Sequence, residues 1–245
     1  MKMKKHTIFT MKFRMIQNEH WCDGGSIKDW AKQNNHQLIY TKLYEYEAVP
    51  NEIDADGLIV LGGPQNPHTT VEECPFYDAS KIRALIKKYI DANKIVIGFC
   101  LGSQLIGEAL GAEYSHSPYQ EVGYVKGIFT SEGRKDPLFS SFPDEMDIGA
   151  WHNDMPGLTK DTVIIMKSEG CPRQIVKYSK YVYGFQTHLE FDRTSYLNGI
   201  KESSESLELK GPYIKTKEDI LAFDPSKMNA LLSSFLNKLV DLYLE

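Results

Sequence analysis

The sequence predicts an α/β protein with an open, mostly parallel, twisted sheet and helices on both of its faces. Two short apolar segments, 57–61 and 95–97, are rich in β-branched residues and are typical of buried strands. Between the predicted strands stand segments with apolar residues at helical spacing, long enough to serve as crossover connections. The order strand, helix, strand, strand, helix, strand, helix therefore favours parallel strands covered by helices.

The first half of the chain alternates between strand-like and helix-like segments. Ser26 stands where it could cap the first helix with its side chain. Gly111 directly follows the last of these helices, at the position where glycine commonly ends a helix. We expect a strand within 7–16, a helix over 27–34, strands over 37–44 and 57–61, a helix within 72–91, a strand over 95–97 and a helix over 103–110.

The second half changes character after residue 113, where glycines, aromatic residues and polar residues are mixed. Residues 228–244 carry apolar side chains at helical spacing, which predicts an amphipathic helix that docks on the domain rather than forming a dimer contact. We divide the chain into an α/β domain, 1–196, and a C-terminal extension, 197–245. Further expected elements are strands at 123–130, 162–166, 173–177 and 181–190, a short helix at 136–139, and a linker or exposed helix over 201–208.

Size and composition exclude several classes of protein. The chain has 245 residues, of which 42% are apolar and 25% charged, values ordinary for a globular domain. Its formal net charge of −5 argues against a nucleic-acid partner, and no apolar run reaches the roughly 18 residues that a membrane helix needs. Lys12 and Arg14 interrupt the apolar stretch that an export signal requires. We expect a cytoplasmic protein with no membrane contact.

The distribution of the cysteines also favours a cytoplasmic protein. The four cysteines are widely scattered and form no Cys-x-x-Cys pair, so neither a zinc site nor a disulfide framework is expected. A reduced compartment fits this pattern. We also expect no metal and no cofactor.

The segment around Cys100 is the first candidate for chemistry. In Gly98-Phe-Cys100-Leu-Gly102, a residue that can act as a nucleophile is flanked by glycines at minus two and plus two, between a strand and a helix. The same arrangement describes the Gly-x-Ser-x-Gly nucleophile elbow, a tight turn that forces its central residue into an unfavourable backbone conformation. The helix N-terminus beneath the thiol would favour the thiolate.

A buried, unreactive core cysteine is the alternative for Cys100, because most cytosolic cysteines have that fate. The two flanking glycines favour the elbow, since the end of an ordinary buried strand has no need of both. Gln104, one turn into the predicted helix, adds to the same interpretation.

A glycine pair forms the second candidate. Gly62 and Gly63 follow a buried strand and precede Pro64. Backbone at this point can approach a ligand closely, and one N–H group could point at a developing oxyanion. An ordinary tight turn is the alternative, because Gly-Gly-Pro makes one readily.

His188 and Glu190 form the third candidate. On a strand, a spacing of two puts both side chains on one face, where the carboxylate could fix the tautomer of the imidazole. Cys100, His188 and Glu190 would then be nucleophile, base and orienting group. A structural histidine beside a surface glutamate is the alternative, and His152, in a polar cluster with Trp151, competes for the role of base.

These segments together resemble a known family. Gly98-Phe-Cys-Leu-Gly-Ser-Gln104 matches the Gly-x-Cys-x-Gly-x-Gln motif of class I (triad-type) glutamine amidotransferases, and Gln186-Thr-His-Leu-Glu190 is similar to their Gln-x-His-x-Glu segment. Gly62-Gly-Pro64 resembles their oxyanion loop. Collinear details resemble a stand-alone group related to the glutaminase domain of GMP synthetase: Glu121-Val-Gly-Tyr124, Asp136-Pro-Leu-Phe139 and Trp151-His-Asn-Asp154. The likeness covers roughly residues 5–195.

The resemblance implies a flavodoxin-like fold and a set of roles. Cys100 would attack the side-chain amide of glutamine, and His188, held by Glu190, would move the proton to departing ammonia. The backbone N–H groups of Gly63 and Leu101 would bind the oxyanion. Substrate contacts would come from Gly62, Gln104, Trp151 and His152. Leu189 stands where many relatives have proline.

Three functions remain open at this point. The first is a glutaminase-type amidotransferase acting through a γ-glutamyl thioester. It would pass ammonia to a separate synthetase subunit, because only about fifty residues follow Glu190, too few for a synthetase domain. The second is a γ-glutamyl peptidase or hydrolase with a larger substrate. The third is a binding or regulatory protein without turnover. A homodimer is compatible with each of them.

Overall fold

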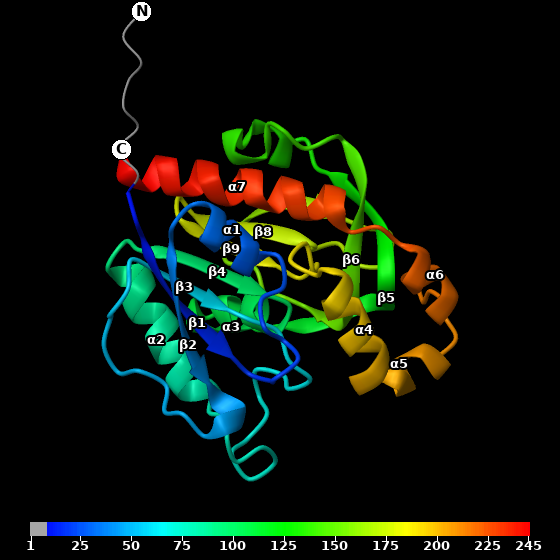
Figure 1. The fold of residues 1–245 in the computed structure, drawn as a ribbon, viewed down its shortest axis with the longest axis horizontal. Coiled ribbons are helices and arrows are strands. Elements are labelled where there is room, and N and C mark those ends of the chain that lie inside the picture. Colours follow the sequence, from blue (N-terminus) through cyan, green and yellow to red (C-terminus); the bar gives the residue numbers. More distant parts are fainter. Residues whose placement is uncertain (1–8) are drawn as a thin grey trace, which may run out of the picture.

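The protein is described here by a computed structural model that covers residues 9–245. A nine-stranded sheet forms its centre, with the strand order β2-β1-β3-β4-β9-β8-β7-β5-β6 (Figure 1). The elements are β1 Lys12–Gln17, α1 Ile27–Gln33, β2 Gln37–Lys42, η1 Leu43–Glu45, β3 Gly57–Val60, α2 Ala79–Asp91, β4 Ile95–Phe99, α3 Leu101–Ala109, β5 Ser115–Phe129, η2 Gly133–Lys135, η3 Pro137–Phe139, β6 Glu145–Met155, β7 Val163–Lys167, β8 Ile175–Ser179, β9 Val182–Phe185, α4 Arg193–Glu202, α5 Ser204–Glu208, α6 Lys217–Ala222 and α7 Ser226–Leu244.

The prediction of an α/β fold is confirmed, and the sheet has two halves of different character. Strands β2, β1, β3, β4 and β9 run parallel to one another. From β9 onward the neighbours β8, β7, β5 and β6 pair antiparallel. The expected strand at 123–130 is part of the much longer β5, and the first two residues of the expected segment 7–16 lie outside the described part of the chain.

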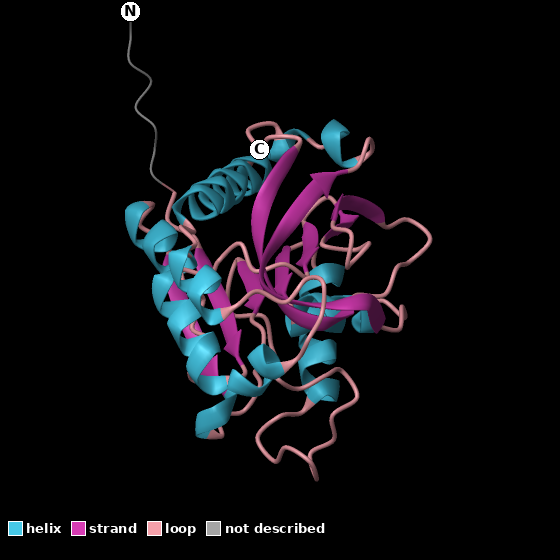
Figure 2. Cartoon of the chain, turned by 90° about the vertical axis from the view of Figure 1, so that its right-hand side faces the viewer, coloured by secondary structure: helices cyan, strands magenta, loops and turns pink. Residues whose placement is uncertain are grey.

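Buried side chains on both faces explain why the parallel strands read as continuous apolar runs. In β4, Ile95, Ile97 and Phe99 belong to one apolar cluster, whereas Val96 belongs to the cluster on the opposite face. This alternation follows the two-residue period of a strand. Helices α2 and α3 cover the second face, and α1 and α7 cover the first, so helices flank the sheet on both sides (Figure 2).

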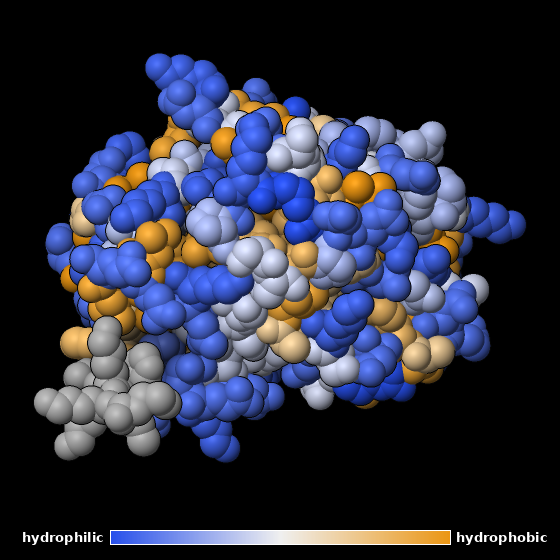
Figure 3. Space-filling view, turned by 90° about the horizontal axis from the view of Figure 1, so that it is seen from above, coloured by the Kyte–Doolittle hydropathy of each residue, from blue (hydrophilic) through white to orange (hydrophobic). Residues whose placement is uncertain are grey.

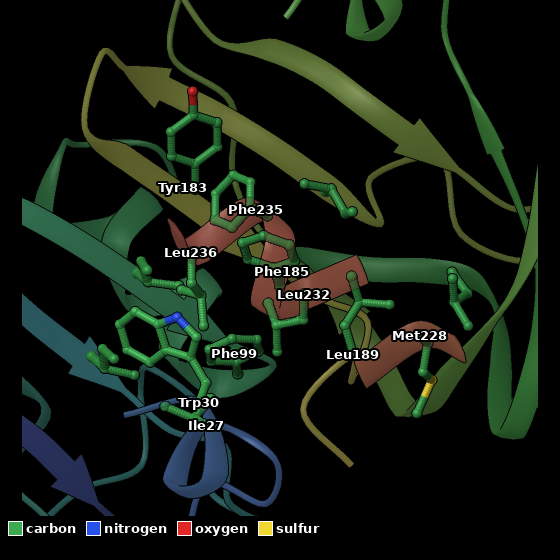
Figure 4. Packing of buried hydrophobic residues seen from close by; sticks show 14 of the residues in the cluster. Ile27, Trp30, Phe99, Tyr183, Phe185, Leu189, Met228, Leu232, Phe235 and Leu236 are labelled. Carbon is green, nitrogen blue, oxygen red and sulfur yellow. The ribbon is translucent and has the colours of Figure 1, made fainter. Parts of the chain in front are cut away.

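The C-terminal helix α7 packs on the sheet, as its amphipathic pattern predicts. Phe235 is fully buried, and its ring centroid lies 4.9 Å from that of Phe139 and 5.2 Å from that of Phe185. Trp30 of α1 donates a 2.7 Å hydrogen bond to Asn237 of α7. Figure 4 shows the α7 side chains among those of the sheet and α1. Helix α7 therefore completes the core of the α/β layer.

The division into a domain of 1–196 and an extension of 197–245 stays a prediction. The proposed boundary falls inside helix α4, and the core on the α7 side of the sheet draws residues from both parts. Residues 201–208, expected to be a linker or an exposed helix, form the end of α4 and the short α5.

The expected side-chain cap of α1 is wrong. Ser26 already has helical backbone angles, φ −65° and ψ −13°, and its side chain makes no capping hydrogen bond. The carbonyls of Gly24 and Gly25 accept from the N–H groups of Ile27 and Lys28 instead. Two glycines with positive φ make this backbone turn accessible, so the first free N–H groups of the helix find partners without a side chain.

The outer surface carries both hydrophilic and apolar side chains. Seen from above, it shows hydrophilic side chains with smaller apolar patches between them (Figure 3). Within residues 9–245, none of the helices combines the length and the apolar character needed to cross a membrane.

Removing the ring of Phe235 tests whether α7 belongs to the core. We expect Phe235→Ala to lower the free energy of unfolding by about 3–5 kcal/mol, because a large buried ring leaves a cavity between α7 and the sheet. Urea denaturation of the full chain measures this. Asp241→Ala, at an exposed position on the same helix, serves as the control. Equal stability of the two variants would show that α7 is not an integral part of the folded core.

Candidate active site

The candidate residues meet where the parallel strands end. The segments after β1, β3, β4 and β9 all emerge at the carboxyl ends of neighbouring parallel strands. Open α/β sheets commonly place their ligand sites at this edge. The sheet thereby brings Gly62, Cys100 and His188 together although they are far apart in sequence.

Cys100 has the strained backbone that the sequence predicts for an elbow. Its φ is +48° and its ψ is −110°, between the last residue of β4 and the first of α3. A Cβ on Gly98 would lie 2.3 Å from the carbonyl of Gly102, and a Cβ on Gly102 would lie 2.0 Å from the carbonyl oxygen of Val60. Any side chain at either glycine would therefore push helix α3 away from the sheet.

His188 and Glu190 form the expected pair, but not on a strand. Strand β9 ends at Phe185, and the two residues lie in the turn that follows, so the prediction of a strand over 181–190 is wrong for this part. The pair forms because His188 N–H donates to the Gly149 carbonyl and the chain then turns back. His188 Nδ1 lies 2.7 Å from Glu190 Oε1 in this arrangement.

Two helices hold this turn. The Ser26 N–H donates to the Glu190 carbonyl at the start of α1. On α7, the Asn229 side chain donates to the carbonyls of Leu189 and Phe191 at 2.8 and 2.9 Å. The C-terminal helix thus supports the residues on both sides of Glu190.

The surroundings of His188 favour its protonated form. Burial alone lowers the pKa of the imidazole, but the charge of Glu190 and hydrogen bonds with Cys100 and Glu190 outweigh burial and raise that pKa to about 10. A Cβ on Gly62 would lie 3.4 Å from both Cys100 Cβ and His188 Cε1, so the thiol-bearing residue and the ring flank Gly62. Phe191 stacks on the imidazole with 4.0 Å between ring centroids.

Two backbone N–H groups near Cys100, those of Leu101 and Gly63, have no hydrogen-bond acceptor within residues 9–245. Leu101 is the first residue of α3, so its N–H has no acceptor within the helix. Gly63 lies on the adjacent loop, whose position Asn18 fixes by donating to the carbonyls of Leu61 and Gly62 at 2.8 and 3.1 Å. Asn18 is fully buried and was not singled out from the sequence. Its only sequence signal is a polar residue directly after a buried strand.

A pocket of about 310 Å³ opens at Cys100. Cys100 is 8% exposed, so the thiol can be reached from the pocket, and Gly63, Leu101 and His188 share the lining. Of the four residues predicted to bind substrate, Gln104, Trp151 and His152 line this pocket. Gly62 instead lines a smaller cavity on the other side of His188.

His152 is engaged elsewhere and does not replace His188. Its Nε2 lies 3.2 Å from Glu121 Oε2, and both side chains are almost fully buried. Glu121 accepts hydrogen bonds from Ser168 and Gln174, whereas neither ring nitrogen of His152 makes a hydrogen bond within residues 9–245. The competing prediction of His152 as the base therefore loses support, because its ring faces a second carboxylate.

Sequence reasoning missed two features of the pocket. Helices α4 and α5 supply part of the wall through Gly199, Ser203 and Ser206, residues that no motif distinguishes. Gln186, quoted above only as part of a motif, places its side-chain Nε2 3.4 Å from Cys100 Sγ. Among residues 9–245 there is no group of three or more His, Cys, Asp or Glu side chains arranged to hold a metal ion.

Comparison with known proteins decides the family. The family model for glutamine amidotransferase class-I matches residues 24–201. The chain belongs to the class I glutamine amidotransferase family. It is 40% identical over 232 residues to the glutamine amidotransferase-like protein YfeJ of Salmonella typhimurium, covering 94% of this chain and 97% of that protein.

A solved structure shares this fold, and longer relatives share part of the sequence. The crystal structure of SMU.1228c superposes with a TM-score of 0.90 at 40% identity, over 94% of this amidotransferase-family chain and 100% of the other. GMP synthase [glutamine-hydrolyzing] of Caldanaerobacter subterraneus is 27% identical over 169 residues, which cover 67% of this chain but 30% of that enzyme. The chain therefore spans about a third of the length of such synthases.

The raised pKa of His188 predicts a pH dependence of stability. A folded-state pKa near 10, against an ordinary value of 6.5, stabilises the fold fully below pH 6.5, and this contribution is lost as the pH rises toward 10. We expect the loss of unfolding free energy in His188→Gln to be largest near pH 6 and to shrink steadily up to pH 10. Denaturant unfolding across this range measures it, with the exposed Asp241→Ala as control. A difference that stays constant with pH would contradict the protonated imidazole.

Proposed function

We propose that the protein hydrolyses the side-chain amide of glutamine through a γ-glutamyl thioester on Cys100 and releases ammonia. The observation that carries this proposal is the thiol of a strained elbow, open to a pocket and next to an imidazole held by a buried carboxylate. Membership in the class I glutamine amidotransferase family supports the same reaction.

The first half of the reaction forms the thioester. With the proton on His188, as the raised pKa of that imidazole favours, the Cys100 thiolate attacks the amide carbon, so the C–O π electrons move onto oxygen. Glu190 stabilises the imidazolium through its 2.7 Å contact with Nδ1. When the C–N bond breaks, His188 returns the proton to nitrogen and ammonia leaves.

The second half releases glutamate. Water loses a proton to His188 and attacks the thioester carbon, and the thiolate departs as the tetrahedral intermediate collapses. His188 keeps the proton that it took from water beside the Cys100 thiolate, which restores the starting state. The tetrahedral intermediate of each half-reaction carries an oxyanion, for which the N–H groups of Gly63 and Leu101 are the proposed donors. Removing one such donor typically costs about 10²–10³ in rate.

Unpartnered polar atoms in the pocket fit the polar end groups of glutamine. Gln104 is 3% exposed, and its Oε1 has no hydrogen-bond partner among the described residues. An acceptor in this state favours a ligand with an N–H donor, such as the α-ammonium group. We assign Gln104, Trp151 and His152 to substrate contact on this ground and from their place in the lining.

Ammonia released here needs an acceptor, and we propose a separate synthetase chain. In the bacterial GMP synthase noted above, the matched region is only 30% of the enzyme, so the remainder has no counterpart in this chain. A partner of that kind would dock where ammonia leaves the pocket.

Hydrolysis of a larger γ-glutamyl compound is the second candidate, favoured by the pocket itself. A volume of about 310 Å³ falls within the range of roughly 300–1,000 Å³ that suits drug-sized ligands. Trp21, Trp151 and Phe191 in the lining offer apolar surface that free glutamine does not need. The leaving group of that reaction would be an amine larger than ammonia, and it could pack against these rings.

Replacing the nucleophile tests the first proposal. We expect Cys100→Ala to lower ammonia release from glutamine by at least about 10³-fold, because the sulfur that forms the proposed thioester is gone. The fold should persist, since the change removes one sulfur atom at the pocket wall. Coupled detection of glutamate measures turnover. Cys74→Ala, at a cysteine outside the pocket lining, is the matched control and should keep wild-type activity. Full activity in Cys100→Ala would end the thioester mechanism.

A substrate panel separates the three functions. We expect kcat/KM for glutamine to match or exceed that for γ-glutamyl peptides and γ-glutamyl arylamides, since the proposed substrate is the free amide. Values higher by orders of magnitude for the larger compounds would instead establish the γ-glutamyl hydrolase. A correctly folded protein that turns over no member of the panel, and whose Cys100 resists a glutamine-like electrophile, would be a binding or regulatory protein.

A further inference from the structure

The side chain of Gln186 contacts the Cys100 thiol, but the reaction described above assigns it no role. Its Nε2 lies 3.4 Å from Cys100 Sγ, within hydrogen-bonding range for sulfur. It belongs to the segment that carries His188, one residue past the end of β9. The sulfur therefore has an amide and an imidazole as neighbours, both supplied by the same strand end.

The Gln186 amide is held from behind by two buried partners. Gln104 Nε2 donates to its Oε1 at 3.1 Å, and Ser103 Oγ, which lies 2.7 Å from the Cys100 carbonyl oxygen, is 3.2 Å from the same Oε1. Gln186 and Ser103 are fully buried and Gln104 is 3% exposed, so water does not compete for these contacts. The backbone N–H of Gln186 donates to the Gln174 carbonyl at 2.8 Å, which fixes the base of the side chain.

This arrangement sets the orientation of the amide once the thiol loses its proton. A thiolate accepts hydrogen bonds and donates none, so only Nε2 toward the sulfur puts a hydrogen between the two atoms. Gln104 Nε2 donates to Gln186 Oε1 in that orientation. Hydrogen bonds to an ionised group are roughly twice as strong as neutral ones.

We propose that Gln186 is a further catalytic residue that donates a hydrogen bond from Nε2 to Cys100 Sγ and stabilises the thiolate. The inference rests on the proposed role of Cys100 as nucleophile. While the proton lies on His188, the Gln186 N–H donates to the thiolate sulfur until the sulfur lone pair attacks the carbonyl carbon. Gln186 is engaged again when the thiolate departs from the thioester. No atom of Gln186 is transferred.

Alkylation of Cys100 by iodoacetamide tests this without any substrate. Peptide mass spectrometry follows Cys100 separately from the other three cysteines. We expect Gln186→Leu to slow alkylation near neutral pH about tenfold and to move its pH dependence upward by about one unit, because the thiolate loses a charge-assisted donor. Gln186→Glu, of the same size, should be slower still, since an ionised carboxylate repels a thiolate. In turnover, kcat should fall about tenfold with KM little changed.

Asn237→Leu is the control for loss of a buried polar contact, because it removes a side-chain hydrogen bond on α7 away from the sulfur. It should alkylate like the wild type. Thermal unfolding of each variant shows whether the fold persists. Alkylation of Gln186→Leu and Gln186→Glu with the wild-type pH dependence would overturn the role of Gln186. If the alkylation profiles shift but wild type releases no ammonia from glutamine, the proposed function fails and the role of Gln186 stands.

Discussion

The positive φ of Cys100 is the constraint on which the rest of the site depends. A non-glycine residue in such a conformation costs on the order of 1–3 kcal/mol, and it persists only where the surroundings enforce it. Here the enforcement comes from the close approach of α3 to β3 across Gly102, and from the Cys100 N–H, which donates to the Phe185 carbonyl at 2.7 Å. The same turn that strains Cys100 exposes the N–H of Leu101 beside the sulfur.

The parallel half of the sheet converts this local turn into a site. Because β1, β3, β4 and β9 end at one edge, the polar residues that follow them converge without any long loop. Asn18 fixes the glycine loop, and the turn after β9 supplies Gln186, His188 and Glu190. The antiparallel half supplies Gly149, whose carbonyl holds the His188 backbone, and the pocket wall at Trp151.

The fold and the elbow could largely be predicted because local patterns in the sequence specify them. Buried parallel strands read as β-branched runs, and Gly98 and Gly102 mark a turn that tolerates no side chain. The pairing of His188 with Glu190 was predicted for the wrong reason. A two-residue spacing suggested a strand face, whereas a turn anchored on Gly149 forms the pair. Long-range backbone contacts of this kind leave no periodic signal in the sequence.

Residues that act through distant partners could not be predicted from local patterns. The sequence shows Gln186 only as the first residue of the Gln-x-His-x-Glu segment, and not that its amide lies 3.4 Å from a sulfur 86 positions earlier in the chain. Asn229 reaches the turn that carries His188 and Glu190 from a helix that sequence alone shows only as amphipathic. The same holds for the pocket wall of α4 and α5, since small polar residues on a surface helix look alike whether they face solvent or a ligand.

The covalent intermediate is the most direct measurement of the central claim. Protein quenched in acid within milliseconds of mixing with glutamine can be digested and analysed by mass spectrometry. The account predicts a γ-glutamyl adduct on Cys100 that accumulates during turnover, disappears when glutamine is exhausted and is absent in Cys100→Ala. Turnover without any adduct on Cys100, or with the adduct on a different residue, would contradict it.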